Sequence, residues 1–236
     1  MNGCRGKKAF VVTIDGPAGS GKSTVAKRVA EETGLRYLDT GKLYRAITLY
    51  LSRLSIPPFE SENLKATLAD LSLEIEDNVV LVSGQDVTEE LHTPAIDSIV
   101  SLYAALPSVR ERLLDLQRMQ AEAPGLIADG RDMGSVVFPD ADLKIYLTAD
   151  SRERARRRYF EQSARGDRIT MEQTLSIVLS RDETDSKREL APLVIPEGAV
   201  ILDTTGKPPR EVLGEILRLI EEIWHGDAEG DFADVR

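Results

Sequence analysis

The sequence predicts an α/β fold: a five-stranded parallel sheet covered by helices on both faces, with a small inserted β-containing subdomain. Short apolar runs of strand length alternate along the chain with stretches of helical periodicity, which is typical of a parallel sheet. Because these runs are apolar over most of their length, both faces of the sheet should be buried. The predicted strands span residues 10–14, 36–38, 126–128, 143–147 and 200–202.

Helical patterns follow the first two predicted strands. Residues 22–32 place Val25 and Val29 on one face, and Gly34 provides the residue at which this helix can end. A second helix is predicted through 43–51 and should end before the two prolines at 57–58. This strand–helix–strand–helix order supports the parallel sheet.

One segment breaks the alternation of strands and helices. Residues 71–88 alternate apolar and polar side chains with a period of two, with turn signals at 77–78 and 83–84. Ser61 is a suitable cap for a helix just before this segment. We therefore predict an inserted subdomain at 67–104 that contains a short antiparallel hairpin or meander.

Composition excludes several classes of protein. The chain has 236 residues, of which 42% are hydrophobic and 30% charged, enough for one substantial core. No apolar run reaches the length of a membrane span, and no long apolar region of the kind found in a secretory signal follows the basic N-terminal residues. A single cysteine cannot form an internal disulfide. We expect a cytoplasmic protein that binds no membrane, with a disordered tail at 226–236.

Charge is distributed unevenly along the chain. The formal net charge is −10, which disfavours binding of a nucleic-acid polymer. Nevertheless, residues 152–168 contain three acids and seven arginines: Arg152, Arg154, Arg156, Arg157, Arg158, Arg165 and Arg168. A local concentration of cations in an acidic protein suits a small polyanion that binds at one place.

A phosphate-binding loop follows the first predicted strand. The pattern G-x-x-x-x-G-K-[ST] is matched without a gap by Gly16, Pro17, Ala18, Gly19, Ser20, Gly21, Lys22 and Ser23. Glycines let successive backbone N–H groups point at phosphate oxygens, and the N-terminus of the next helix adds partial positive charge. Lys22 can reach the outer phosphates, and the Ser23 hydroxyl can ligate Mg²⁺.

The rest of the chain favours a small-molecule kinase over two other users of such a loop. A switch GTPase needs N-K-x-D to read guanine, but lysine follows none of the asparagines (Asn2, Asn63 and Asn78). A motor-type ATPase usually has a longer apolar strand that ends in Asp-Glu, whereas residues 126–131 end in Asp-Gly-Arg.

Phosphoryl transfer requires further cations, because donor and acceptor are both anions. Thr40 and Arg45 follow the second strand, and Arg131 and Asp132 follow the strand at 126–128, so all should lie at the carboxyl edge of the sheet. On the arginine-rich helix only one or two side chains can face a ligand, and Arg157 or Arg158 are the candidates.

A later helix carries two more arginines and an acid on one face. Arg181, Asp185 and Arg188 are spaced by four and three residues, whereas Asp182 lies off that face. The three could form an ordinary exposed ion-pair set, or the acid could orient both arginines toward a ligand. The isolated His92 and His225 have no metal-ligand spacing and are expected to be structural or exposed.

Taken together, these motifs resemble the bacterial cytidylate kinases. The resemblance extends from about Val11 to about Thr204, and the insert at 71–88 resembles the enlarged nucleoside-monophosphate-binding insert of those enzymes. It rests on five stretches, at 14–24, 37–45, 127–134, 138–141 and 181–188. Lys42 departs from the pattern, because the family often has a small residue there.

The resemblance implies ATP- and Mg²⁺-dependent phosphorylation of CMP or dCMP by a monomer. It implies a kinase core at 9–66, 105–152 and 180–225, and a helical lid at 153–179 that closes over ATP, with Arg157 as an ATP contact. The ATP phosphates would be held by Gly16, Pro17, Ala18, Gly19, Ser20, Gly21, Lys22, Ser23 and Thr24. The catalytic cations would be Lys22, Arg131 and Arg188.

The resemblance also implies an acceptor site. Thr40 would lie in it, and Arg45 and Arg131 would clamp the acceptor phosphate, with Arg188 near the phosphates. Arg181 and Asp185 would lie near the sugar, and the cytosine edge would be read by Ser101, Arg110 and Asp132. Two alternatives stay open: a kinase for another small acceptor, such as shikimate or a different nucleoside monophosphate, and a nucleotide-binding module without turnover.

Overall fold

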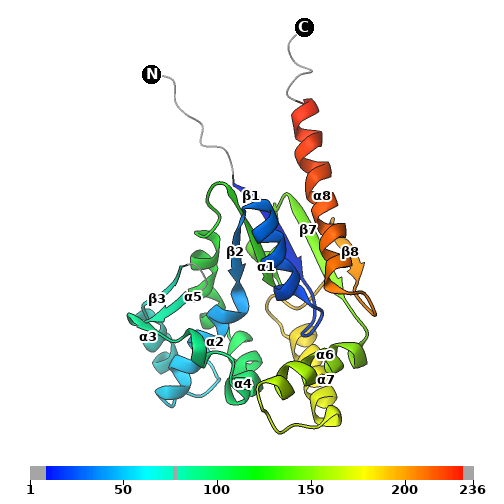
Figure 1. Ribbon diagram of the computed structural model, residues 1–236. Helices are drawn as coiled ribbons and strands as arrows, with labels where there is room; N and C mark the ends of the chain where they lie inside the picture. The colour runs from blue at the N-terminus through cyan, green and yellow to red at the C-terminus, as the bar shows by residue number, and fades with distance from the viewer. Residues whose placement is uncertain (1–8, 77–78, 231–236) are drawn as a thin grey trace, which may run out of the picture.

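The computed structural model describes residues 9–76 and 79–230, and its centre is a parallel sheet (Figure 1). Within the described residues the sheet has five strands in the order β2-β6-β1-β7-β8, and every pairing in it is parallel. The predicted fold class and all five predicted strands are confirmed. Their bounds are β1 (Phe10–Asp15), β2 (Arg36–Asp39), β6 (Gly125–Gly130), β7 (Leu143–Thr148) and β8 (Val200–Asp203).

Both faces of the central strands β1 and β6 are buried, whereas the edge strand β8 leaves Ile201 exposed. In β6, Leu126 and Ala128 belong to one hydrophobic cluster, and Ile127 between them belongs to the other, because successive strand residues point to opposite faces. One face is covered by α1 (Lys22–Thr33) and α8 (Pro209–Gly230), and the other by α2 (Thr40–Arg53) and α5 (Pro107–Arg118).

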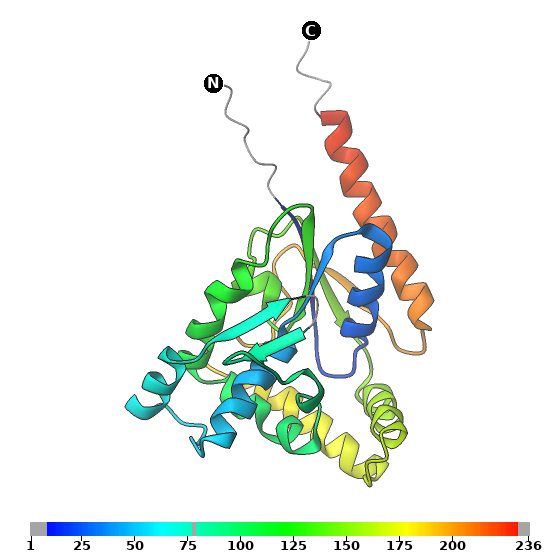
Figure 2. The ribbon, with the colours of Figure 1, turned by 60° about the vertical axis from the view of Figure 1, so that its left-hand side comes forward.

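The predicted insert is a second small sheet packed on the core with α2 and α5 (Figure 2). Its strands pair antiparallel in the order β3-β4-β5. The predicted cap is present, since Ser61 Oγ accepts a hydrogen bond from Leu64 N at 3.1 Å; the turn expected at 77–78 lies outside the described residues. The elements of this region are α3 (Glu62–Ala69), β3 (Leu73–Glu76), β4 (Val79–Val82), β5 (Gln85–Asp86), η1 (Thr88–Glu90) and α4 (Pro94–Ala104).

The arginine-rich segment forms α6 (Ser151–Ala164) and the turn after it, and α6 packs against the next helix, α7 (Met171–Lys187). Arg154 on α6 forms two hydrogen bonds with Asp182 on α7, at 3.0 and 2.6 Å, which join the two helices. A capping box between Thr170 and Gln173 begins α7. The segment expected to form the lid is therefore an ordered helical hairpin.

The C-terminal helix corrects one expectation. The disordered tail was expected to begin at residue 226, but α8 continues to Gly230, and residues 231–236 lie outside the described part of the chain. None of the helices in that described part combines the length and apolar character needed to cross a membrane.

The carboxyl ends of β1, β2 and β6 meet beside the N-terminus of α1, between the insert and the α6–α7 hairpin (Figure 1). The chain turns sharply after β1 because Gly16 has φ +146° and a side chain there would collide with the Leu147 carbonyl oxygen. Buried Asp15 accepts hydrogen bonds from the backbone N–H of Met133 at 2.8 Å and Gly134 at 2.7 Å. These bonds fix the π-helical turn η2 (Met133–Val137) that follows β6.

Candidate active site

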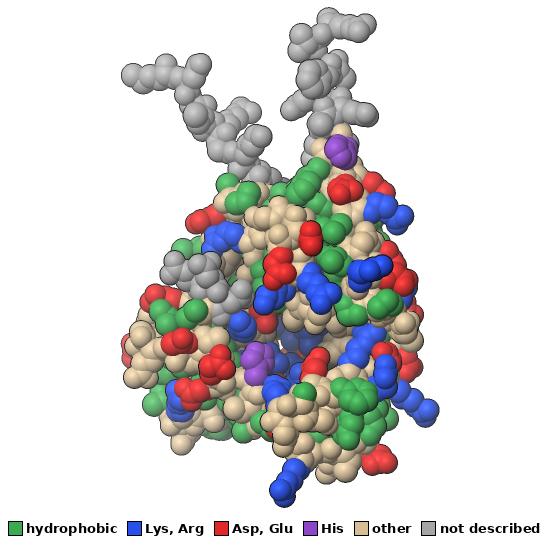
Figure 3. All heavy atoms as spheres, viewed as in Figure 1, with side chains coloured by type: hydrophobic (Ala, Val, Ile, Leu, Met, Phe, Trp, Pro, Cys, Tyr) green, Lys and Arg blue, Asp and Glu red, His purple; other side chains and the backbone are tan. Residues whose placement is uncertain are grey.

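A cavity of about 540 Å³ opens at this edge of the sheet. Among the described residues, seven Lys and Arg and five Asp and Glu side chains line it, in a chain whose net charge is −10. Figure 3 shows a hollow there with Lys and Arg side chains around it. The lining comes from the phosphate loop, α2, α4, the end of β6, α6 and α7. The lining therefore carries an excess of positive charge in an acidic protein, which suits a bound polyanion.

The phosphate loop leads directly into α1. Gly21 occupies the N-cap position of α1 with φ +95°, and no side chain caps the helix. Buried Lys22 Nζ donates hydrogen bonds to Pro17 O at 2.8 Å and Ser20 Oγ at 3.4 Å. Burial, and then the charge of Arg131, lowers the pKa of Lys22 well below its usual value. A phosphate at this helix N-terminus would relieve that repulsion.

The predicted loop residues divide into two groups. Ala18, Gly19, Gly21, Lys22, Ser23 and Thr24 line the cavity, whereas Gly16, Pro17 and Ser20 are not part of its lining. Gly16 makes the turn after β1, and Pro17 and Ser20 accept hydrogen bonds from Lys22. This second group therefore shapes the loop.

Asp129, which is not among the predicted site residues, lies at the end of β6 and faces the loop. Its carboxylate accepts hydrogen bonds from Ser23 Oγ at 2.7 Å and Tyr37 Oη at 3.2 Å. Burial, and then the nearby Asp39, raises the pKa of Asp129 to about 7. The sequence feature that could have identified Asp129 as a site residue is its position in Asp-Gly-Arg at the carboxyl end of a predicted strand.

Ser23 and Asp129 fit a Mg²⁺ ion. Mg²⁺ in phosphoryl-transfer sites usually keeps several waters and binds one or two carboxylates together with substrate phosphates. A hydroxyl and a carboxylate in hydrogen-bond contact, with Asp39 close by, supply that donor set. The described residues contain no group of three or more His, Cys, Asp or Glu that could enclose a metal.

Arg131, Arg181, Asp185 and Arg188 meet on the opposite wall. Asp185 Oδ2 accepts from Arg131 Nε at 2.9 Å, and Asp185 Oδ1 lies 4.0 Å from Arg188 Nη1. Burial alone would raise the pKa of Asp185, but Arg131, Arg181 and Arg188 outweigh it and lower that pKa. Asp185 is only 4% exposed, so the group is not an ordinary exposed ion-pair set.

The three arginines of this wall carry more positive charge than the single Asp185 carboxylate can neutralise. Burial, and then Arg131 and Arg45, lowers the pKa of Arg181 to about 9. Within the described part of the chain, Arg181 Nε is buried without a hydrogen-bond partner. A buried donor of this kind is costly unless something accepts from it. An anionic ligand in the cavity would meet that requirement.

Asp132, Arg110 and Ser101 form a polar corner of the site. Asp132 is 1% exposed, forms an ion pair with Arg110, and lies 3.6 Å from Arg188 Nη2. The Arg110 guanidinium lies over the Tyr44 ring, 5.6 Å from its centroid. Ser101 and Asp132 line the cavity, whereas Arg110 is not part of the lining. A carboxylate, a hydroxyl and a guanidinium together can hydrogen-bond the edge of a base.

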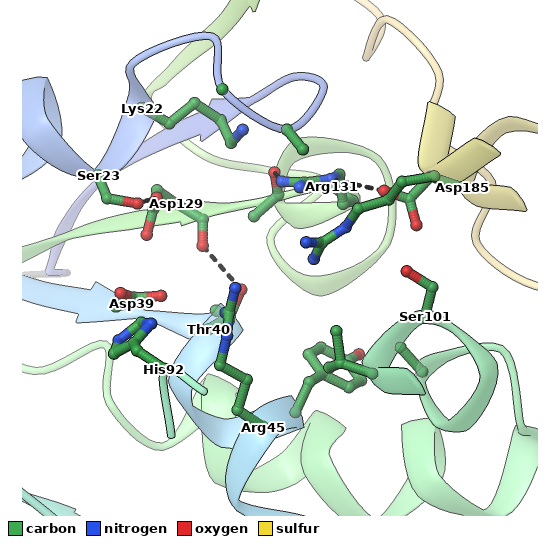
Figure 4. A pocket seen from close by; sticks show the side chains of 18 of the residues that line it. Lys22, Ser23, Asp39, Thr40, Arg45, His92, Ser101, Asp129, Arg131 and Asp185 are labelled. Carbon is green, nitrogen blue, oxygen red and sulfur yellow. Dashed lines mark hydrogen bonds and ion pairs between the residues drawn. The ribbon is translucent and has the colours of Figure 1, made fainter. Parts of the chain in front are cut away.

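Thr40 and Arg45 lie on α2. Thr40 Oγ1 donates to Asp129 O at 2.7 Å, so this hydroxyl ties α2 to β6 (Figure 4). Arg45 donates to Asp97 Oδ1 from Nε at 3.3 Å and from Nη2 at 3.1 Å. A side chain at Gly41 would lie 2.8 Å from Arg45 Nη1, so the glycine leaves room for the guanidinium. Figure 4 shows Lys22, Arg45 and Arg131 directed toward one space.

The arginines of α6 make different contacts: some bind backbone carbonyls, and another lines the cavity. Arg157, the predicted ATP contact, is not part of the cavity lining; it donates to Thr204 O at 2.6 Å and Ser20 O at 3.4 Å. Arg154 is buried and donates to Ala18 O at 3.1 Å. Arg158, the other candidate, lines the cavity.

Other lining residues were not foreseen as site residues. His92 was expected to be structural or exposed; it is exposed, and it also lines the cavity. Partial desolvation of its imidazole at the cavity, and then the charge of Arg45, lowers its pKa. Arg165 and Glu161 also line the cavity from α6 and the residue that follows it. No sequence signal distinguished these three from other surface residues.

Comparisons with known proteins agree with this geometry. Residues 12–222 match the family model of cytidylate kinase. The chain is 42% identical over 216 residues to the cytidylate kinase of Caldanaerobacter subterraneus subsp. tengcongensis, covering 92% of this chain and 96% of that protein. It is 44% identical over 220 residues to that of Symbiobacterium thermophilum, covering 90% and 96%.

A solved structure shares the fold alone. The structure of an uncharacterized protein from Eubacterium ventriosum superposes with a TM-score of 0.52 at 13% identity, covering 91% of this chain and 99% of that one. The family assignment rests on the sequence matches, because the family model and the two relatives each match most of the chain. The chain belongs to the cytidylate kinase family.

Proposed function

We infer that this protein transfers the γ-phosphoryl group of ATP to CMP or dCMP, forming ADP and CDP or dCDP. The observation that carries this inference is the cavity at the carboxyl edge of the sheet, where seven cationic side chains surround a phosphate loop in a member of the cytidylate kinase family. Two nucleotides repel each other through their phosphates, and fixed cations in a buried site offset that repulsion.

The donor site is assigned to the phosphate loop. The first amides of α1 and the Lys22 ammonium would bind the ATP phosphates, with Lys22 held in place by Pro17 O. Mg²⁺, when bound, neutralises phosphate charge and orients the γ-phosphate. Ser23 and Asp129 would hold the ion, and Tyr37 orients the Asp129 carboxylate through its hydrogen bond.

The acceptor site is assigned to the cavity walls. Arg45, Arg131 and Arg188 would bind the acceptor phosphate and the transferring group. Arg181 and Asp185 would contact the sugar, and Thr40 would position the end of β6. The polar corner of Ser101, Arg110 and Asp132 would read the cytosine, whose exocyclic amino group donates and whose ring atoms accept.

The transfer step itself needs little proton chemistry. The attacking atom is a phosphate oxygen that already carries negative charge, so no general base is required. Catalysis then depends on alignment of the two phosphates and on neutralisation of charge in the transition state. We propose that α6 and the insert close on the nucleotides, because water must be excluded before transfer.

Two further features are proposed with this function. All residues assigned here belong to one chain, so we propose that a monomer suffices, which light scattering of the active protein would test. We propose the cytoplasm, where ATP is available, as the place where the protein acts.

The function is tested with a panel of acceptors. A coupled assay with ATP and Mg²⁺ should show the highest kcat/KM for CMP or dCMP, compared with UMP, AMP, GMP and shikimate. A preference for shikimate or a purine nucleotide would reject the assignment. ATP binding without production of ADP at saturating CMP would indicate a nucleotide-binding module instead.

A further inference from the structure

Asp97 on α4 joins two elements that carry different parts of the site. One of its oxygens accepts from Arg45 on α2, at 3.3 and 3.1 Å, and the other pairs with Arg158 on α6. The side chain of Asp97 is 10% exposed, as is that of Arg45, and that of Arg158 is 21% exposed. Both arginines line the cavity, whereas Asp97 is not part of the lining.

Asp97 supplies the negative charge that lets these cations approach each other. Burial alone would raise its pKa, but Arg45, Arg158 and Arg181 outweigh burial and lower that pKa, so the carboxylate is ionised at neutral pH. Without this charge, two guanidinium groups would face each other across a buried space. The Asp97 carboxylate therefore binds both guanidinium groups at once and allows them to lie close together.

The two arginines belong to opposite sides of the reaction. Arg158 lies on α6, and α6 is tied to the phosphate loop through the hydrogen bonds of Arg154 to Ala18 O at 3.1 Å and of Arg157 to Ser20 O at 3.4 Å. Arg45 lies on the acceptor side. Asp97 is thus a direct connection between the helix that contacts the donor loop and an arginine of the acceptor site.

A second contact supports the same approach of α6 and α4. Arg165, just after α6, donates to His92 O at 3.2 Å, close to the N-terminus of α4. This hydrogen bond is exposed, and its acceptor is a backbone carbonyl. It therefore holds the end of α6 near α4 but does not involve Arg45. The contact of Asp97 with Arg45 extends the connection into the acceptor site.

We propose that Asp97 is a positioning residue through which ATP and the acceptor nucleotide strengthen each other's binding. This inference rests on the proposed function. Bound ATP, held by the loop that α6 contacts, stabilises the observed arrangement of α6 against α4, in which the pair of Arg158 with Asp97 fixes the carboxylate that orients Arg45 toward the acceptor phosphate. By linkage, a bound acceptor that fixes Arg45 favours the same closed arrangement and tightens ATP binding by the same factor.

The test is a binding cycle measured by isothermal titration calorimetry. CMP is titrated into the protein alone and into the protein saturated with Mg²⁺ and a non-hydrolysable ATP analogue. The parent protein should bind CMP at least about fivefold more tightly with the analogue present. In Asp97→Asn this ratio should fall close to one, while each nucleotide still binds alone. The matched control is Glu183→Gln, which removes one negative charge from an exposed ion pair with Lys187 on α7; it should keep the parent's ratio.

Arg158→Gln provides a second route to the same result, because it removes the other partner of the ion pair. It keeps the test decisive if melting shows that Asp97→Asn does not fold, and it too should bring the ratio close to one. A purely structural role of Asp97 would lower the melting temperature and leave the ratio unchanged. An unchanged ratio in folded Asp97→Asn or Arg158→Gln, or no enhancement in the parent, would overturn the inference. Failure of the parent to phosphorylate CMP would instead reject the proposed function.

Discussion

Replacement of Arg131 by alanine separates the catalytic role of a site cation from its role in stability. Arg131 lies just after β6, and its Nε is 2.9 Å from Asp185 Oδ2; the two side chains are 18% and 6% exposed. Its charge is also the first cause, after burial, that lowers the pKa of both Lys22 and Arg181. Removal of Arg131 therefore breaks an ion pair and relieves repulsion between cations.

The structure sets the size of both effects. Breaking a buried ion pair costs about 3–5 kcal/mol when the partner is left alone. Asp185 is not left alone, since Arg188 Nη1 lies 4.0 Å from its carboxylate and Arg181 also stabilises it. We therefore expect a loss of less than about 2 kcal/mol, or a decrease in melting temperature below about 8 °C. Turnover should decrease about 10²- to 10³-fold, the effect of removing one donor that stabilises transition-state charge.

The assay pairs kinetics with thermal unfolding of the same preparations. Initial rates with saturating ATP, Mg²⁺ and CMP give kcat, and calorimetry of the nucleotide-free protein gives the melting temperature. Arg131→Lys is the matched control: it keeps the charge, loses the planar fork, and should lie between the parent and Arg131→Ala in kcat. A kcat of Arg131→Ala within tenfold of the parent would refute the catalytic role. A decrease in melting temperature well beyond about 8 °C would refute the inference that Arg181 and Arg188 still stabilise Asp185.

Four further predictions concern other parts of the site and the C-terminal helix. Asp132→Asn should raise KM for CMP about tenfold or more and leave KM for ATP unchanged, because it removes a carboxylate from the base-reading corner; equal effects on both would contradict that role. Gly41→Ala should raise KM for CMP by displacing Arg45, since its Cβ would lie 2.8 Å from Nη1. In contrast, a Cβ at Gly214 in α8 would have no atom of the described residues within 4 Å apart from its chain neighbours and the backbone of its own helix, so Gly214→Ala should leave kinetics unchanged and stabilise the fold by about 0.5–1 kcal/mol in calorimetry. Burial raises the pKa of Asp129 from 3.8 to about 7, so the folded state keeps a proton that the unfolded state releases, and this contribution to stability is lost as pH rises from about 4 to 7. Denaturant unfolding should show the free energy of unfolding of the parent falling relative to that of Asp129→Asn over this range and changing little relative to it above about pH 8.

Local patterns predicted much of the fold because they depend on neighbours in sequence. Strand-length apolar runs, the Ser61 cap and the phosphate loop are encoded within a few residues, and the structure contains each of them. The strand order β2-β6-β1-β7-β8 depends on packing between distant segments. The π-helical turn after β6 likewise depends on Asp15, more than a hundred residues earlier in the chain.

The candidate site was predicted less completely, for two physical reasons. Helical periodicity limits how many arginines of α6 can face a ligand, but it does not fix the rotation of the helix; Arg158 lines the cavity and Arg157 does not. Long-range pairs carry no signal in a single sequence: Asp97 contacts Arg45 from 52 residues away. Asp129 is different, because the sequence does indicate its position at the end of a strand. It does not indicate that Ser23 and Tyr37 donate hydrogen bonds to it.

The convergence of the site cations on the phosphates of both nucleotides is tested most directly by a crystal structure of the protein with a bisubstrate analogue in which adenosine and cytidine are joined through a chain of phosphates. We expect Lys22, Arg45, Arg131 and Arg188 all to lie within hydrogen-bonding distance of phosphate oxygens, with cytosine beside Asp132. Side chains of these four residues that point away from the phosphates, or cytosine in another part of the molecule, would rule out the proposed arrangement.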